Sequence, residues 1–73
     1  MRIGTFAKKN NLNTETIRYY MELGLVVPVK KGGHYDFSGN CQRSLDQVLT
    51  FKSMGFTLQE IRSILHFSAL SRL

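Results

Sequence analysis

Apolar and polar residues follow the period of an α-helix from Thr14 to about Leu23, and we expect a helix there. Ile17 and Met21 are four residues apart, so they share the face that would be buried. Tyr19 points to the opposite face, because successive residues are rotated by about 100° around a helix. Arg18 lies beside Tyr19 on this outer face. The other neighbours there are two carboxylates, Glu15 and Glu22.

A tyrosine beside an arginine is unusual on the outer face of a soluble helix, which ordinarily carries Glu, Lys and Gln. A phosphate backbone and base edges suit this pair, because Arg18 can donate bidentate hydrogen bonds while Tyr19 stacks or donates its hydroxyl. We expect Tyr20 on the rim between the two faces. An ordinary amphipathic helix with a surface tyrosine of no function remains the alternative.

A shorter helix is predicted from Ile3 to about Lys9, where apolar residues recur at i, i+3 and i+4. The segment Asn10–Asn13 then reads as a tight turn, since asparagine tolerates left-handed backbone. Leu12 is expected to fill the core between the helices, and Asn13 is a favourable N-cap for the second one. This order predicts a helix-turn-helix whose second helix reads DNA, although any small helical hairpin gives the same pattern.

A two-stranded hairpin is expected after the second helix. Gly24 is placed to end that helix in a left-handed conformation, and Pro28 prevents a new one from starting. The pair Gly32-Gly33 supplies the positive φ of a tight turn. Because an isolated hairpin is marginal in water, we expect this one to pack on the helices through Val29 and Phe37.

Three side chains of this hairpin remain to face outward: Lys30, Lys31 and Tyr35. A basic hairpin beside a reading helix is typical of a wing that lies along a phosphate backbone. Each lysine taken singly is equally consistent with a residue that only keeps an exposed hairpin in solution, because exposed charges often contribute little.

A third helix is expected from the N-cap Ser38 to about Met54, where Gly55 stops it. Lys52 falls on the edge of its apolar stripe, so its stem should be half buried while its ammonium reaches solvent. The stripe itself consists of small and branched apolar residues: Cys41, Leu45, Val48 and Leu49.

A fourth helix is predicted to open at the capping box Thr57–Glu60, with Phe56 packed on Ile61 as a hydrophobic staple. Its inward residues are expected to be Leu58, Ile61, Ile64 and Leu65. The segment from Phe67 to Leu73 has apolar residues and no strong cap. It reads either as a frayed end or as the root of a further helix that packs on another subunit.

Composition narrows the function classes. At 73 residues with a 42% apolar share, the chain is a single domain near the lower size limit for independent folding, and it is not expected to be disordered. Ten Lys and Arg against five Asp and Glu give a net charge of +5. This excess favours a polyanionic partner, nucleic acid before membrane. The single cysteine and the lack of a membrane-spanning or signal segment fit a cytoplasmic protein.

The sequence offers little for catalysis or metal binding. His34 and His66 are far apart, and neither has a carboxylate or cysteine at a spacing that would build a nucleophile–base pair. No C-x-x-C or H-x-x-x-H spacing supports a metal site with Cys41. We therefore expect no enzyme activity, no metal and no cofactor.

The chain resembles the MerR family of bacterial transcription regulators from Arg2 to Leu65. The order and spacing of the matching pieces are far more specific than any piece alone. These pieces are Ile3-Gly4-Thr5-Phe6-Ala7, Thr16-Ile17-Arg18-Tyr19-Tyr20, Gly24-Leu25 with Pro28, and Lys52-Ser53-Met54-Gly55-Phe56-Thr57-Leu58-Gln59-Glu60-Ile61. The resemblance implies a mainly α, winged helix-turn-helix fold of four helices, with a small two-stranded wing between the second and third.

The resemblance also implies which residues meet DNA. Arg18 and Tyr19 would lie in and beside the major groove, with Tyr20 near the backbone. Thr14 and Thr16 can donate to phosphates or bases, while Glu15 either accepts from a cytosine amine or only caps the helix. The full set of expected DNA-binding residues is Thr14, Glu15, Thr16, Arg18, Tyr19, Tyr20, Lys30, Lys31, Tyr35 and Lys52.

The wing departs from the common family form. Family members often carry Gly-Tyr-Arg-x-Tyr where this chain has Gly33-His34-Tyr35-Asp36-Phe37. Tyr35 thus replaces the wing arginine, and Asp36 adds a charge that phosphate would repel. Wing contacts are left to Lys30, Lys31 and Tyr35.

The resemblance further implies a homodimer. Its two subunits would be joined by a long antiparallel helix after the fourth helix, and an effector domain would follow. Residues 1–73 are therefore expected to be the DNA-binding domain, with the dimerisation helix beyond Leu73 and the effector domain absent from this chain. The implied partners are double-stranded promoter DNA, RNA polymerase and a second subunit, with no membrane. Such dimers bend and untwist promoter DNA that they hold at two ends.

Two other function classes remain. An excisionase-type architectural DNA-binding protein uses a similar small winged fold without an effector domain. A protein-interaction module with a basic face would meet an acidic partner instead, and its affinity for nucleic acid would not depend on Tyr19.

Overall fold

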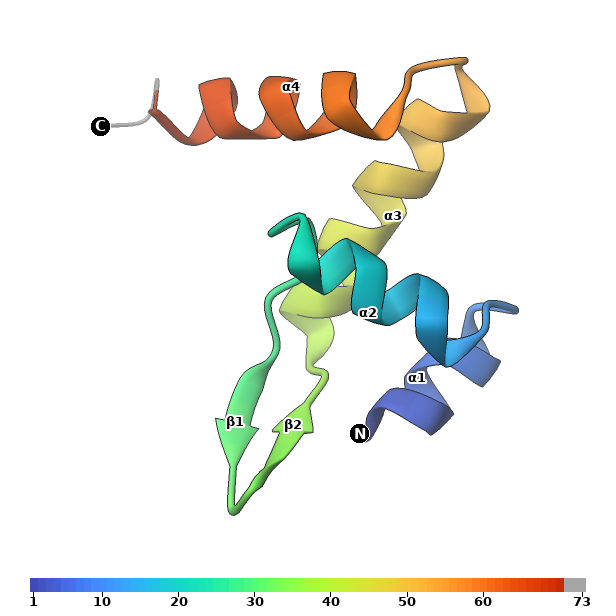
Figure 1. Ribbon diagram of the computed structural model, residues 1–73, viewed down its shortest axis with the longest axis vertical. Helices are drawn as coiled ribbons and strands as arrows, with labels where there is room; N and C mark the ends of the chain where they lie inside the picture. The colour runs from blue at the N-terminus through green and yellow to red at the C-terminus, as the bar shows by residue number, and fades with distance from the viewer. Residues whose placement is uncertain (71–73) are drawn as a thin grey trace.

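The computed structural model describes the backbone of residues 1–70 and the side chains of residues 1–67. The elements follow in the order α1 (Ile3–Lys9), α2 (Thr14–Glu22), β1 (Val29–Lys31), β2 (His34–Asp36), α3 (Gly39–Ser53) and α4 (Leu58–Leu70). Helix α1 packs on α2, α3 packs on α4, and the hairpin projects at the opposite end of the molecule from α4 (Figure 1). The predicted winged helix-turn-helix architecture is confirmed.

The turn between α1 and α2 forms as the asparagine pattern predicts. Asn11 takes a left-handed conformation with φ of 57°. The Asn13 side chain caps α2, because its Oδ1 accepts a hydrogen bond of 2.8 Å from the backbone N–H of Thr16. Gly24 follows α2 with φ of 74°, so the predicted left-handed end of this helix is also confirmed.

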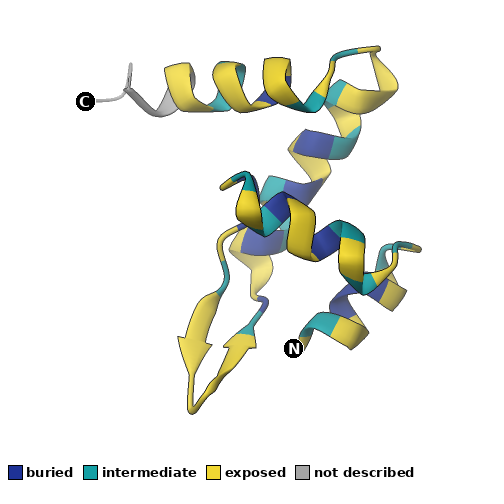
Figure 2. Cartoon of the chain, viewed as in Figure 1, coloured by how far each residue is buried: buried dark blue, intermediate teal, exposed yellow. Residues whose placement is uncertain are grey.

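The core joins the helix-turn-helix to the base of the wing. Phe6 of α1 stacks on Phe37 with ring centroids 4.9 Å apart, and both residues are buried. Ile17 of α2 and Leu45 of α3 are fully buried in the same cluster. Figure 2 shows buried segments on α1, α2 and α3, where the three helices come together. The C-terminal end of α1 is linked to α3 as well, through two reciprocal amide hydrogen bonds between Asn10 and Gln42.

The prediction that Tyr20 lies on a rim is wrong, because its side chain is only 2% exposed. Tyr20 stands three residues after Ile17, so the two side chains lie on the same side of α2 and enter one core. Tyr19, by contrast, is 50% exposed, as predicted. The buried face of α2 is therefore wider than the i, i+4 pattern of Ile17 and Met21 indicates.

The hairpin has the predicted turn but not all of the predicted packing. Its strands are antiparallel, with Lys30 opposite Tyr35, and the two turn glycines have positive φ. Phe37 is buried as expected, whereas Val29 is 55% exposed, so the prediction that Val29 packs on the helices is wrong. The strands project away from the helices (Figure 1), and the buried contact of the wing with the helices is at its base, through Phe37.

Most of the predicted ends of the last two helices are confirmed. The capping box of α4 is formed reciprocally: Thr57 N–H donates to Glu60 Oε1 at 2.8 Å, and Glu60 N–H donates to Thr57 Oγ1 at 3.1 Å. Ser38 holds the N-cap position of α3 but makes no side-chain capping bond. Phe56 packs edge-on against Phe51. Helix α4 continues through Leu70, and residues 71–73 lie outside the described part.

The apolar stripe of α3 is buried at Cys41, Leu45 and Val48 and partly buried at Leu49. In α4, Ile61 is fully buried, whereas the other three predicted inward residues, Leu58, Ile64 and Leu65, are only partly buried. None of the helices in the described residues has the length and apolar character needed to cross a membrane.

The neighbouring tyrosines of α2 give a matched test of this core. We expect Tyr20→Ala to lower the free energy of unfolding by about 3–5 kcal/mol, because it leaves a large cavity. Tyr19→Ala should change it by less than about 0.5 kcal/mol, because it removes a surface side chain. Urea unfolding followed by circular dichroism at 222 nm measures both. Similar losses in the two variants would contradict the placement of these side chains.

The capping box predicts a pH dependence of stability. Hydrogen bonds from Thr57 hold the pKa of Glu60 below its ordinary value of 4.5. The ionised carboxylate therefore stabilises the fold above that value, and this contribution is lost as pH falls through the lower pKa of the folded state. The parent chain should be more stable than Glu60→Gln at pH 7, and the difference should shrink on acidification. Gln59→Ala, at a neighbouring exposed position without a titrating group, should give a difference that does not change with pH.

Candidate nucleic-acid interface

The outer face of α2 carries the predicted reading side chains. Arg18 and Tyr19 are both exposed, and Arg18 Nη1 lies 3.5 Å from Thr14 Oγ1. In this contact the guanidinium donates, so the Thr14 hydroxyl keeps its own proton for an external acceptor. Glu15 is also exposed, in the first turn of the same helix. Thr14 is partly buried, whereas Glu15, Arg18 and Tyr19 are exposed. Figure 2 shows exposed positions along the outer side of α2.

Thr16 is committed to the helix cap. Both its backbone N–H and its hydroxyl donate to Asn13 Oδ1, at 2.8 Å and 2.9 Å. Its hydroxyl proton is therefore used within the chain, and the side chain is free only to accept. Thr16 is partly buried and acts chiefly as a support for the start of α2.

The outward side chains of the wing contact one another. Lys30 and Tyr35 stand directly opposite on the two strands, and the Lys30 ammonium lies 5.5 Å from the centroid of the Tyr35 ring. This cation–π contact keeps the charge on the exposed face of the hairpin. Lys31 is exposed too, with its Nζ 3.7 Å from the carboxylate of Asp36.

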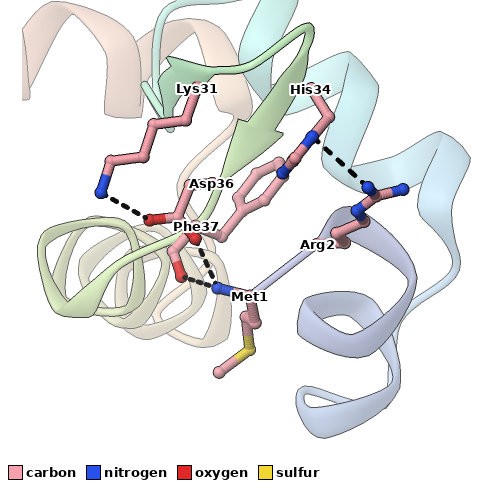
Figure 3. A network of polar contacts seen from close by, with 6 residues as sticks. All are labelled: Met1, Arg2, Lys31, His34, Asp36 and Phe37. Carbon is pink, nitrogen blue, oxygen red and sulfur yellow. Dashed lines mark hydrogen bonds and ion pairs between the residues drawn. The ribbon is translucent and has the colours of Figure 1, made fainter.

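Asp36 pairs with two ammonium groups of the protein at the base of the wing. Its Oδ1 accepts from the α-ammonium group of Met1 at 2.7 Å, and Lys31 lies on its other oxygen (Figure 3). The hydrogen bond and charge of the Met1 ammonium, with a smaller contribution from Lys31, lower the pKa of Asp36. Close by, the N–H of Phe37 donates to the carbonyl of Met1 at 2.7 Å. The carboxylate thus pairs within the protein at this base.

A groove of about 550 Å³ separates α2 from the wing and the start of α1. Arg18 of α2 and Tyr35 of β2 line it together, although they are distant in the sequence. Arg2 and His34 also line it, and Arg2 Nη2 lies 3.4 Å from His34 Nδ1 (Figure 3). The fold therefore joins the reading helix and the wing into one surface.

Sequence reasoning missed Arg2 and His34. Arg2 stands at the N-cap position of α1 without a side-chain capping bond, and His34 reads as one of two isolated histidines. The feature that brings them together is the pairing of Met1 with Phe37, which is not local in the sequence. The one indication available is the departure of the wing from the family pattern at His34.

Only Arg18 and Tyr35 of the ten expected DNA-binding residues line this groove. Two of the others, Tyr20 and Lys52, lie on neither the outer face of α2 nor the wing. Tyr20 belongs to the core. Lys52 is exposed near the C-terminal end of α3, roughly 20 Å along the helix from the end next to the wing at 1.5 Å per residue.

A separate groove of about 640 Å³ lies between the end of α2 and α4, where it includes Arg62 and His66. Within the described residues, no group of three or more His, Cys, Asp or Glu is placed to hold a metal ion.

Comparisons with known proteins find similar chains among transcriptional regulators. The chain is 37% identical over 75 aligned positions to the HTH-type transcriptional regulator YfmP of Bacillus subtilis, covering 99% of this chain and 51% of that protein. It is 40% identical over 67 positions to the mercuric resistance operon regulatory protein of Bacillus cereus, covering 88% and 50%. The ZntR homolog of Haemophilus influenzae, also an HTH-type transcriptional regulator, is 31% identical over 74 positions, with 99% and 55% covered.

The chain thus spans about half the length of the curated relatives it matches. No solved structure matches it at a significant level. The family model described as MerR HTH family regulatory protein matches residues 1–68, which include every helix and strand up to most of α4. The chain therefore belongs to the MerR family of helix-turn-helix regulatory proteins.

Proposed function

We propose that this chain binds double-stranded DNA sequence-specifically, as the N-terminal DNA-binding part of a bacterial transcription regulator. Arg18 and Tyr19 read the major groove, supported by Thr14 and Glu15, while the wing follows the phosphate backbone through Lys30, Lys31 and Tyr35. One observation carries this proposal: Arg18 and Tyr35 line the same groove, so the reading helix and the wing share one exposed surface.

The distribution of charge supports a polyanionic partner. The net charge is +5, and three of the five side-chain carboxylates accept hydrogen bonds within the protein, Asp46 from Gln42 among them. Asp36 pairs with cations at the base of the wing, and Glu60 caps α4. Glu15 and Glu22 remain on the outer side of α2, where they disfavour non-specific contact with phosphate and leave specific contacts to Arg18 and Tyr19.

We further propose that the complete regulator acts as an effector-responsive homodimer in the cytoplasm, with a dimerisation helix after α4 and RNA polymerase as its partner at the promoter. The relatives are about twice as long as this chain, which supports a second half with a separate role in the complete regulator. Their names as regulators also favour this function over an architectural protein of the excisionase type. A dimer that holds DNA at two ends can bend and untwist the segment between them.

The first test identifies the preferred duplex and then removes the reading arginine. The chain is used to select a binding site from a randomised duplex pool, and affinities are measured by fluorescence anisotropy for the selected and a scrambled duplex. Arg18→Ala should cost about 1–3 kcal/mol on the selected duplex and much less on the scrambled one, because base contacts carry specificity.

Arg62→Ala is the matched control for this test, because it removes the same charge from the separate groove beside α4. It should lower both affinities slightly and equally. An Arg18→Ala variant that loses affinity equally on both duplexes would remove the assigned reading role, while failure of the parent chain to bind any duplex would remove the function itself.

The second test concerns dimerisation. The chain alone is expected to bind a duplex of two half-sites weakly, because one domain makes only part of the phosphate contacts. Two copies joined by a flexible linker long enough to reach both half-sites should bind about 10²–10⁴-fold more tightly through effective concentration. Tight, sequence-specific binding by a strict monomer, verified by analytical ultracentrifugation, would contradict this proposal.

A further inference from the structure

One positively charged side chain that lines the groove between α2 and the wing has no role in the function proposed above. Arg2, just before α1, extends its guanidinium toward β2, where Nη2 lies 3.4 Å from His34 Nδ1 (Figure 3). Both residues are exposed. Of the residues that the structure describes, only Met1 and Lys31 form ion pairs, both with Asp36, so the guanidinium of Arg2 has no carboxylate partner there.

The wing has a corresponding deficit of positive charge. Tyr35 stands where the family pattern often has arginine, and the charge of Lys31 is partly neutralised by Asp36 at 3.7 Å. Lys30 is held over the Tyr35 ring. Beside α2, the wing itself therefore presents no strong bidentate donor to a phosphate. The nearest guanidinium on that side of the groove is that of Arg2, which comes from a different element.

The contact between Arg2 and His34 arranges hydrogen-bond donors. A guanidinium only donates, so His34 Nδ1 can take part in this contact only as an acceptor, which leaves Nε2 as the ring nitrogen that can donate. The pair thus offers the remaining guanidinium N–H groups and one imidazole N–H to an external acceptor. Since the base of the wing is fixed by the bond from Phe37 N–H to the Met1 carbonyl, Arg2 is held next to β2.

The rest of the groove fits one segment of a nucleic-acid backbone. Ile3 and Met21 supply apolar, partly buried surface of the kind that a sugar ring can contact. Arg18 lies on the α2 side, and Tyr35 lies on the wing side. The one carboxylate in the lining is that of Glu22. A bound phosphate must therefore lie toward the guanidinium groups and away from the carboxylate.

We propose that this groove receives one sugar–phosphate unit of the DNA backbone, with Arg2 and His34 as the donors to its phosphate. Arg2 thereby takes the part of the arginine that the wing lacks. This inference rests on the proposed DNA binding, and it assigns to that surface two residues that are additional to Thr14, Glu15, Arg18, Tyr19, Lys30, Lys31 and Tyr35.

The test uses the salt dependence of binding to a mixed-sequence duplex, measured by fluorescence anisotropy from 50 to 300 mM KCl. Loss of one phosphate contact should reduce the slope of log K against log[salt] by about 0.9, which is a roughly eightfold weaker affinity near 0.1 M salt. We expect this change for Arg2→Gln. His34→Ala should weaken binding less, because it removes one neutral donor, and Arg2→Lys should restore most of the slope but not the full affinity.

Arg62→Gln is the matched control, with the same loss of charge in the other groove, and it should change the slope much less than Arg2→Gln does. If Arg2→Gln and Arg62→Gln have the same effect, Arg2 acts only through net charge and the inference is overturned. If the parent chain and its Arg18 dependence behave as proposed while Arg2→Gln binds like the parent, this inference fails and the proposed function stands.

A second measurement identifies the contact itself. On the selected duplex, single phosphates are replaced in turn by neutral methylphosphonates. One position that weakens binding of the parent chain should have no further effect on Arg2→Gln, because the contact is already absent. Thermal unfolding of each variant confirms that the fold is retained. If every position that matters to the parent matters equally to Arg2→Gln, no phosphate is bound by Arg2.

Discussion

The stacking of Phe6 on Phe37 is the contact on which the rest of this small domain depends, because it joins the helix-turn-helix to the base of the wing. The wing has no other buried residue, and its strands are exposed along nearly their whole length. Next to these rings, the N–H of Phe37 donates to the carbonyl of Met1. Together these contacts set the distance between α2 and the wing, and so determine the width of the groove where the two meet.

Electrostatics and packing act together at that base. In the sequence, Asp36 is a negative charge on a surface that we propose binds phosphate. In the structure it pairs with the Met1 ammonium and Lys31, so that most of its charge is balanced locally and it helps to hold the start of the chain against β2. Repulsion of phosphate is therefore a smaller effect than the residue type suggests, and the same pairing brings the side chain that follows Met1 to the wing.

Local features of the fold were predictable, since their causes lie within a few residues. The Asn13 cap, the Gly24 helix end and the Thr57–Glu60 box all formed as expected. What the sequence could not supply is how far each helix is covered by the others, which placed Tyr20 in the core and left Val29 in solvent. The candidate site shows the same division: its α2 residues follow from helical period, whereas its partners before α1 and on β2 come together only through long-range pairing.

The adjacent tyrosines of α2 carry a consequence for how such a domain can diverge. Because Tyr20 and Ile17 fill the interior, the rotation of the helix about its own axis is fixed, and positions such as Glu15 and Tyr19 always face outward. Substitutions at those outward positions leave the interior intact. With the proposed DNA-reading role of this face, new operator preferences can therefore arise there by single changes, without an accompanying loss of folded protein that selection would have to repair.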